Sequence, residues 1–287
     1  MFKNIGLFSS KTMGSNGKEI DIVAVDREYT GPDDLVTDFR LLASNMRDRP
    51  SIFLFPEEIF WGRPILRSEG ISLAERLHEI ANEVGDVYAV YSLFEGQEPE
   101  RRKGVTKYKY VTNTGYIVCP DGEHFVSYFK ISTADRGEVL CGRDWGVISE
   151  NTHCSGIAKR YVYARAKALE RFPRVDIDSA PIEVRLCTDA TLYGTSSDGK
   201  SHIADSHPAK LVCDPMDLML VPAYGLELTE RDSGYILKQL NPDGLAIVLN
   251  RRLTSTSLSF VSHSEPTVMY GNLRDFSYNG FRVRGVK

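Results

Sequence analysis

The chain has 287 residues, of which 42% are hydrophobic and 26% charged, a composition typical of a globular protein with a buried core. Its formal net charge of −4 gives no sign of the basic surface that binds nucleic acid or anionic lipid. The first residues lack the basic and apolar stretches of a signal peptide, and no apolar run approaches the roughly 20 residues that span a bilayer. We therefore expect a cytoplasmic protein with neither nucleic acid nor membrane as a partner.

The five cysteines are odd in number and widely spaced, at Cys119, Cys141, Cys154, Cys187 and Cys213. In a cytoplasmic chain of this size, such cysteines are expected to be free thiols. The sequence also lacks the paired Cys and His spacings of zinc sites and the glycine-rich loop that binds phosphate. We therefore expect neither a metal nor a cofactor.

Alternating strands and helices are predicted for the N-terminal third. Three short apolar runs are typical of buried strands, at residues 20–26, 51–55 and 87–94. Apolar residues recur at helical spacing over residues 33–49, behind two aspartates that favour a helix start. Residues 72–85 predict a second helix, with Ser72 as the N-cap, Glu75 completing a capping box and Gly85 ending it. The order β-α-β-α-β indicates a layered α/β sheet.

The pattern changes after residue 94. Residues 107–131 predict a hairpin whose strands are joined by a Pro-Asp-Gly turn at residues 120–122. Residues 155–174 predict a helical segment with six Lys or Arg residues and one Glu. Buried strands and a short helix between the last two of them are expected in the last third, the strands at residues 182–187, 217–225 and 245–250.

Neither an internal repeat nor a linker interrupts the chain, so we expect a single domain over residues 1–287.

Ionisable side chains follow three of the predicted buried strands. The three are Glu57, Lys130 and Cys187. Taken singly, each has an ordinary structural explanation: an acid in a first helical turn, a lysine at a strand edge, and a small buried thiol. Together they lie at strand ends, where α/β sheets place their ligand sites. A thiol needs a base or a cation to react at neutral pH, and a developing oxyanion needs a donor such as lysine.

The chain resembles the nitrilase superfamily of carbon–nitrogen hydrolases over about residues 20–252. The resemblance rests on four motifs in the family's order: "FPE" at 55–57, "TNTGYIVCPDGEHFVSYFK" at 112–130, "LCTDA" at 186–190 and "DLMLVPAYG" at 217–225. They are similar to the family's glutamate after the second strand, its Asn-Thr, Pro-Asp-Gly and Tyr-x-Lys pattern, its Cys-Tyr-Asp motif and its Asp-x-x-x-x-Pro strand. Four motifs in the same order make the resemblance fairly specific. By this resemblance, the core of the domain is expected to span about residues 20–252, with the basic segment 155–174 as an insertion relative to the family. Residues 253–287 lie beyond the resemblance and are expected to form a tail that packs across a subunit interface.

This resemblance implies a single-domain α/β fold, a four-layer αββα sandwich that forms a homodimer or a larger homo-oligomer. It implies that Cys187 is the nucleophile toward an amide-like carbonyl and that Glu57 is the general base. By the same resemblance, Lys130 stabilises the oxyanion together with the backbone N–H of Thr188. Glu138 matches the family's second glutamate, which orients the substrate and the lysine.

The activity that the resemblance implies is hydrolysis of a small amide through a thioester acyl-enzyme, with release of ammonia or an amine. Three alternatives stay open: an N-carbamoyl hydrolase, a nitrilase, and a binding or scaffold protein with this fold and no turnover. A nitrilase is less favoured because Cys187 is followed by Thr188, where nitrilases have Trp-Glu. The insertion 155–174 is either a lid beside the site or a solvated helix. Glu58 is expected to be a structural neighbour that points away from the site.

Overall fold

Two β-sheets form the centre of the protein. The computed structural model describes residues 19–46, 49–57, 59–60, 64–102, 105–121, 125–130, 172–191, 194–195, 201–202, 214–252, 255–264, 269–271 and 276–286. Within these ranges, the strands and helices together make a mixed α/β protein, as the sequence predicts.

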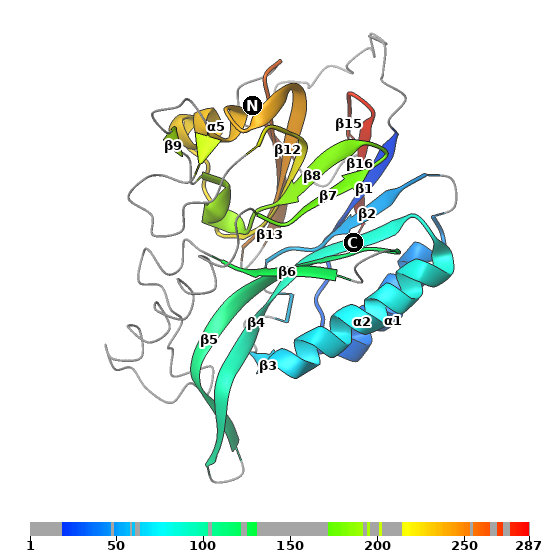
Figure 1. Ribbon diagram of the computed structural model, residues 1–287, viewed down its shortest axis with the longest axis vertical. Coiled ribbons are helices and arrows are strands. Elements are labelled where there is room, and N and C mark those ends of the chain that lie inside the picture. The colour runs from blue at the N-terminus through cyan, green and yellow to red at the C-terminus, as the bar shows by residue number, and fades with distance from the viewer. Residues whose placement is uncertain are drawn as a thin grey trace.

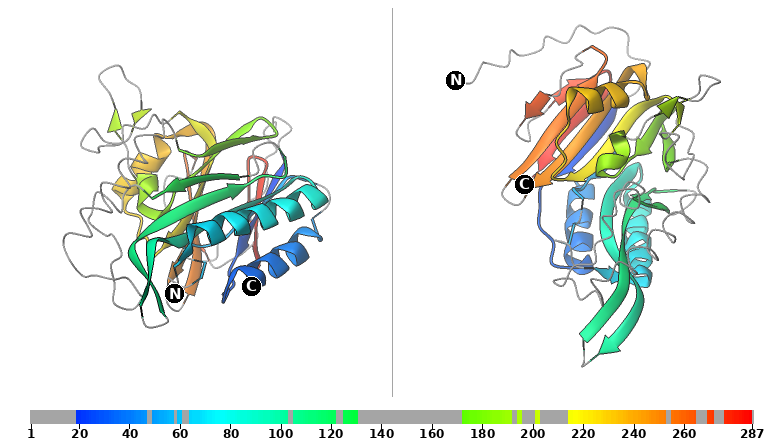
Figure 2. Two further views of the ribbon diagram at one scale, coloured as in Figure 1. Left: turned by 60° about the horizontal axis from the view of Figure 1, so that its bottom comes forward. Right: turned by 90° about the vertical axis from the view of Figure 1, so that its left-hand side faces the viewer.

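The first sheet combines strands from both ends of the chain. Its members are β1 (Ile20–Val25), β2 (Ser51–Leu54), β3 (Ile65–Leu66), β4 (Val87–Arg102), β5 (Val105–Val118), β6 (Phe125–Phe129), β15 (Phe276–Tyr278) and β16 (Phe281–Val286). The strand order is β15-β16-β1-β2-β4-β5-β6, with β3 paired to β4. The strands β16, β1, β2 and β4 are parallel, while β5 and β6 extend the sheet in antiparallel fashion. The far end of the β4–β5 hairpin projects from the body of the protein (Figure 2).

The second sheet is formed by the later part of the chain. Its members are β7 (Arg174–Ile177), β8 (Ala180–Val184), β11 (Met216–Tyr224), β12 (Leu240–Arg252), β13 (Ser255–Ser262) and β14 (Met269–Gly271). The strand order is β14-β13-β12-β11-β8-β7, and β8, β11 and β12 are parallel. Two short strands form a separate pair, β9 (Gly194–Thr195) and β10 (Ser201–His202).

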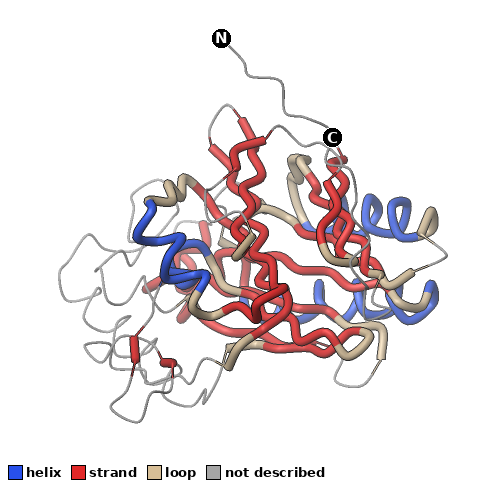
Figure 3. The backbone as a smooth tube through the Cα atoms, turned by 90° about the horizontal axis from the view of Figure 1, so that it is seen from above, coloured by secondary structure: helices blue, strands red, loops and turns tan. Residues whose placement is uncertain are grey.

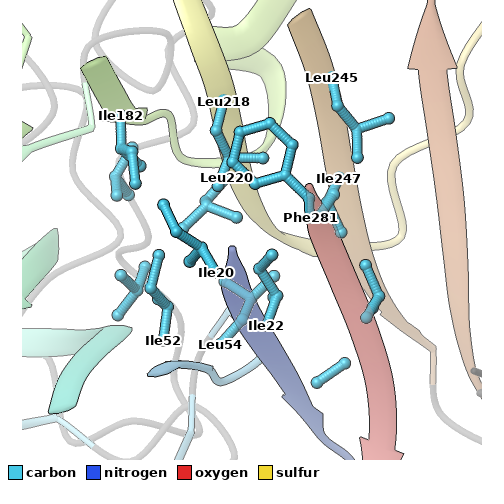
Figure 4. Packing of buried hydrophobic residues seen from close by; sticks show 14 of the residues in the cluster. Ile20, Ile22, Ile52, Leu54, Ile182, Leu218, Leu220, Leu245, Ile247 and Phe281 are labelled. Carbon is cyan, nitrogen blue, oxygen red and sulfur yellow. The ribbon is translucent and has the colours of Figure 1, made fainter. Parts of the chain in front are cut away.

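One apolar cluster holds the two sheets together, face to face (Figure 4). Side chains alternate between the two faces of a strand, so Ile20 and Ile22 of β1 lie on the face toward the second sheet. They share the cluster with Leu218 and Leu220 of β11, and none of the four side chains is exposed. Burial of a side chain of this kind stabilises the fold by roughly 1.5–3 kcal/mol relative to its exposure.

Helices cover the outer faces of both sheets (Figure 1, Figure 3). The described residues contain α1 (Pro32–Ala43), α2 (Arg67–Val84) and α5 (Glu230–Leu237). On the first sheet, Phe39 of α1 lies in one cluster with Phe53 of β2. On the second sheet, Ile236 of α5 lies in one cluster with Val248 of β12. The layers therefore follow in the order helix pair, sheet, sheet, helix.

The alternation predicted for the N-terminal third is confirmed by β1, α1, β2, α2 and β4. The predicted start of the second helix is wrong: α2 begins at Arg67, and Ser72 lies exposed inside it. The Glu69 carboxylate accepts a hydrogen bond from the backbone N–H of Leu66 at 2.7 Å, which satisfies one of the free donors at this helix end. The end of the helix at Gly85 is as predicted, with a positive φ of 77° that glycine adopts without strain.

Most of the later elements match their predictions, and the C-terminal residues are the exception. The strands β5 and β6 form the expected hairpin, β8, β11 and β12 occupy the expected apolar runs, and α5 is the expected short helix. The C-terminal residues 253–287, expected to form a tail, supply β13 and β14 to the second sheet and β15 and β16 to the first. The strand β16 pairs with the whole of β1, and its Phe281 and Val283 lie in the cluster between the sheets.

The basic segment 155–174 is predicted to be helical, but its residues 155–171 lie outside the described residues. Phe172 and Pro173 belong to no helix, and Arg174 begins β7.

Among the described helices, none has the length and apolar character needed to cross a membrane.

Candidate active site

Four strand ends contribute groups to one buried site. From the first sheet, Glu57 follows β2 and Lys130 directly follows β6. From the second sheet, Cys187 opens the short 3-10 helix η2 (Cys187–Thr191) after β8, and Tyr224 is the last residue of β11. Each of β2, β8 and β11 runs parallel to a neighbour in its own sheet. Glu57, Cys187 and Tyr224 lie at the carboxyl ends of these strands, where α/β sheets bind ligands.

Three donors hold the carboxylate of Glu57, a side chain that is only 1% exposed. Its Oε1 accepts hydrogen bonds from Lys130 Nζ and from Asn113 Nδ2, each at 2.7 Å. Its Oε2 accepts a hydrogen bond from the backbone N–H of Tyr224 at 2.8 Å. Since the donors come from both sheets, the carboxylate connects the sheets and is held in one orientation.

Lys130 and Asn113 reach Glu57 from the same face of the first sheet. In the antiparallel β5–β6 pair, Thr114 stands opposite Phe129. The next pair is therefore Asn113 and Lys130, and the Lys130 N–H donates to the Asn113 carbonyl oxygen at 2.8 Å. Residues directly opposite each other in such a pair share a face of the sheet. Strand register thus explains why both side chains contact the same carboxylate oxygen.

Cys187 lies against these groups and is 5% exposed. Its φ of 48° lies in the left-handed region, which costs a non-glycine residue about 1–3 kcal/mol. Its Sγ lies 4.0 Å from the carbonyl oxygen of Tyr224. Burial raises the pKa of the thiol to about 12; the charge of Glu57 adds to this rise, while the Lys130 ammonium opposes it. The resting sulfur is therefore a protonated thiol at neutral pH.

The Lys130 side chain is 11% exposed. Burial on its own lowers the pKa of its ammonium, but the nearby negative charge, chiefly that of Glu57, raises the pKa above its ordinary value. Asp189 is fully buried on η2. The site therefore brings together a carboxylate, an ammonium and a thiol, which are the groups needed for acyl transfer through sulfur.

Three of the predicted site residues are brought together by the structure: Glu57, Lys130 and Cys187. Thr188 follows the cysteine in η2 and is half-buried. Glu138 and Glu58 lie outside the described residues, so the roles expected of them stay predictions. Within the described ranges, no group of three or more His, Cys, Asp or Glu side chains could hold a metal ion.

Two residues of the site have no role in the sequence-based predictions. Asn113 stands in the Asn-Thr pair of the quoted "TNT" motif, which is a usable signal once its strand register is known. Tyr224 ends the buried strand β11 and holds Glu57 through its backbone N–H. A backbone contact of this kind leaves no trace in the residue type.

A second buried carboxyl, Glu95 of β4, lies on the opposite face of the first sheet, under α2. Its oxygens accept hydrogen bonds from the Tyr116 hydroxyl, from Thr114 Oγ1 at 2.8 Å and from Arg67 at 3.0 Å. Burial raises the pKa of Glu95, and these donors offset part of the rise. The fit against the helix is close, because a Cβ at Gly70 would lie 2.6 Å from Glu95 Oε1. This cluster fastens α2 to β4 and β5.

Comparison with known proteins does not assign a family to the chain. No protein-family model and no curated protein matches it. Among solved structures it is similar to a glutamine-dependent NAD+ synthetase from Cytophaga hutchinsonii, at 14% identity and a TM-score of 0.42, over 86% of this chain and 39% of that chain. It is also similar to a glutamine-dependent NAD+ synthetase from Acinetobacter baumannii, at 12% identity and a TM-score of 0.46, over 86% and 42%. The chain thus spans about two fifths of the length of either synthetase.

Proposed function

We propose that the protein is a cysteine-dependent carbon–nitrogen hydrolase of the amidase type. The observation that supports this proposal is the buried contact of Glu57 with Lys130, at 2.7 Å, beside the thiol of Cys187. Buried ion pairs are costly unless their geometry is favourable, and a thiol beside such a pair has the groups that acyl transfer requires. The layer order of helices, sheet, sheet and helix supports the αββα sandwich that the resemblance implies.

In the acylation step, the sulfur of Cys187 attacks the carbonyl carbon of the amide. With a pKa of about 12, the thiol does not ionise by itself at neutral pH, so Glu57 takes the proton as the S–C bond forms. The Lys130 ammonium stabilises the negative charge that develops on the carbonyl oxygen. Glu57 then gives the proton to the leaving nitrogen, the C–N bond breaks, and ammonia or an amine departs.

In the deacylation step, water hydrolyses the thioester. Glu57 takes a proton from the attacking water, and the resulting hydroxyl adds to the thioester carbonyl. When the C–S bond breaks, the proton returns to the sulfur of Cys187 and the carboxylic acid leaves. The backbone N–H of Thr188 is proposed as a second oxyanion donor. Glu138 is proposed to orient the substrate.

The test is an ammonia-release screen over primary amides, carbamoyl amino acids and nitriles. The purified protein is compared with its Cys187→Ala variant, whose fold is checked by circular dichroism and thermal melting. We expect the native protein to release ammonia from at least one amide and the variant to release none. Release that is equal in the two proteins would contradict the assignment of the nucleophile. No release from any compound would favour the binding or scaffold alternative.

A further inference from the structure

Among the described residues, only one end of the Asn113 carboxamide has a hydrogen-bond partner. Asn113 is 6% exposed, and its Nδ2 donates to Glu57 Oε1 at 2.7 Å. A carboxylate can only accept hydrogen bonds, so the NH2 end of the amide faces Glu57. The Oδ1 end is buried and has no hydrogen-bond partner within the described part of the chain.

A buried oxygen without a donor is unfavourable and needs an explanation. The position of Asn113 supplies one. In the proposed reaction, the leaving nitrogen must come within hydrogen-bonding distance of Glu57 to receive its proton. The Asn113 amide contacts that same carboxylate through its NH2 end, so its oxygen lies one amide group away from the carboxylate that the leaving nitrogen must approach.

We propose, resting on the proposed hydrolase function, that Asn113 Oδ1 accepts a hydrogen bond from the N–H of the leaving group. Asn113 thereby selects substrates that carry an NH2 group on the scissile carbon, namely primary amides and carbamoyl compounds. An ester oxygen and a nitrile nitrogen carry no hydrogen, so they leave Oδ1 without a donor in the complex. Sites built to hydrogen-bond a substrate N–H discriminate strongly against analogues that lack it.

This role of Asn113 does not change which bonds form and break in the proposed reaction. The S–C bond forms at Cys187, the C–N bond breaks, and the thiol proton travels through Glu57 to the departing ammonia. Asn113 neither gains nor loses a proton. It holds the leaving nitrogen through one hydrogen bond, and through its NH2 end it holds the carboxylate that protonates this nitrogen.

The experiment compares a primary amide with the methyl ester of the same acid, in the native protein and in Asn113→Ala. Both reactions use Cys187 and Glu57, but only the amide offers an N–H to Asn113. We expect kcat/KM for the amide to fall about tenfold or more relative to the ester. A fall of equal size for both substrates would overturn the inference, because it would mean that Asn113 only orients Glu57.

The matched control is Thr114→Ala, the next residue on β5, whose hydroxyl donates to Glu95 on the other face of the sheet. This variant loses a buried hydrogen bond from the same strand, and the ratio of amide to ester kcat/KM should stay as in the native protein. A similar change of the ratio in both variants would also overturn the inference, since it would indicate a general disturbance of β5.

A measurement on the native protein covers the case in which Asn113→Ala does not fold. The nitrile of the same acid should be turned over at least about tenfold more slowly than the amide, and equal or faster turnover of the nitrile would contradict the role of Asn113. Failure of the hydrolase proposal looks different. There, the native protein hydrolyses none of the three compounds, or Cys187→Ala hydrolyses them equally well.

Discussion

Two buried carboxyl groups lie on opposite faces of the first sheet, and their surroundings differ. Asn113 and Thr114 are neighbours on β5, so their side chains project to opposite faces; one donates to Glu57 and the other to Glu95. Apart from Thr114, the partners of Glu95 are a tyrosine hydroxyl and an arginine, which bind α2 to the sheet. The partners of Glu57 include a lysine ammonium beside a thiol. Both carboxyl groups are thus buried and hydrogen-bonded. Glu57 differs from Glu95 in having a nucleophile, the Cys187 thiol, beside it, and this difference suits the Glu57 site to catalysis.

The largest expected contrast is in turnover. Glu57→Gln should lower kcat for any amide substrate by about 10³-fold or more, because the amide side chain cannot take the thiol proton. The matched variant Glu95→Gln, equally buried on the other face, should keep kcat within about threefold of the native value. Steady-state ammonia release measures both. Comparable losses in the two variants would mean that the loss in Glu57→Gln comes from disturbed folding.

The second prediction separates the charge of Lys130 from its bulk. Lys130→Met removes the ammonium and keeps a side chain of similar length, so kcat should fall about 10²- to 10³-fold through loss of oxyanion stabilisation. The variant also leaves the Glu57 carboxylate buried without its cation, which destabilises the fold. Thermal melting of the variant is therefore measured as well, and the kinetics are recorded below its melting temperature. A kcat close to the native value in folded Lys130→Met would remove Lys130 from the mechanism.

The third prediction concerns the contact between α2 and Glu95. Gly70→Ala places a Cβ 2.6 Å from Glu95 Oε1, and the cost should be about 1–3 kcal/mol of unfolding free energy. The control is Gly234→Ala in α5, where a Cβ meets nothing within 4 Å. This change should stabilise the protein by up to about 1 kcal/mol, since alanine favours helix over glycine. Denaturant unfolding measures both, and changes of the same sign would show that Glu95 does not limit this position.

The smallest expected effect is a pH dependence of stability that belongs to Glu95. Because burial raises its pKa in the folded state, the folded protein binds this proton more tightly than the unfolded chain, whose glutamates titrate near pH ~4.3. The protonated carboxyl is favoured at low pH, and its contribution to stability is lost as pH rises through the folded pKa. Glu95→Gln cannot titrate, so its stability relative to the native protein should improve from pH 4 toward pH 8. A difference that does not change with pH would show that Glu95 has no raised pKa.

Much of the fold was predictable because buried strands in two packed sheets are short apolar runs, as at residues 51–54 and 218–223. The start of α2 was not predictable from the sequence. Its first turn is capped by a hydrogen bond from the backbone N–H of Leu66 to the Glu69 carboxylate, and a leucine at this position gives no capping signal. The pairing of β16 with β1 joins opposite ends of the chain. Local patterns carry no information about such partners.

In the candidate site, too, some residues could be predicted from local sequence and others only from strand pairing. Glu57, Lys130 and Cys187 could be selected because each stands at the end of an apolar run, a local property. The role of Asn113 depends on its position opposite Lys130 in the β5–β6 pair. That register becomes visible only when both strands are paired. Glu95 lies inside a long strand, where alternation alone does not reveal a buried acid.

The most direct test of the proposed function is the mass of the peptide that carries Cys187, measured after acid quenching of the native protein during turnover of a primary amide. In the proposed mechanism this peptide gains the mass of the acyl group, hydroxylamine removes that mass, and ammonia appears as the mass is gained. Ammonia release from a protein whose Cys187 peptide never changes mass would rule out Cys187 as the nucleophile, because the acyl group would then have passed to water without a bond to this sulfur.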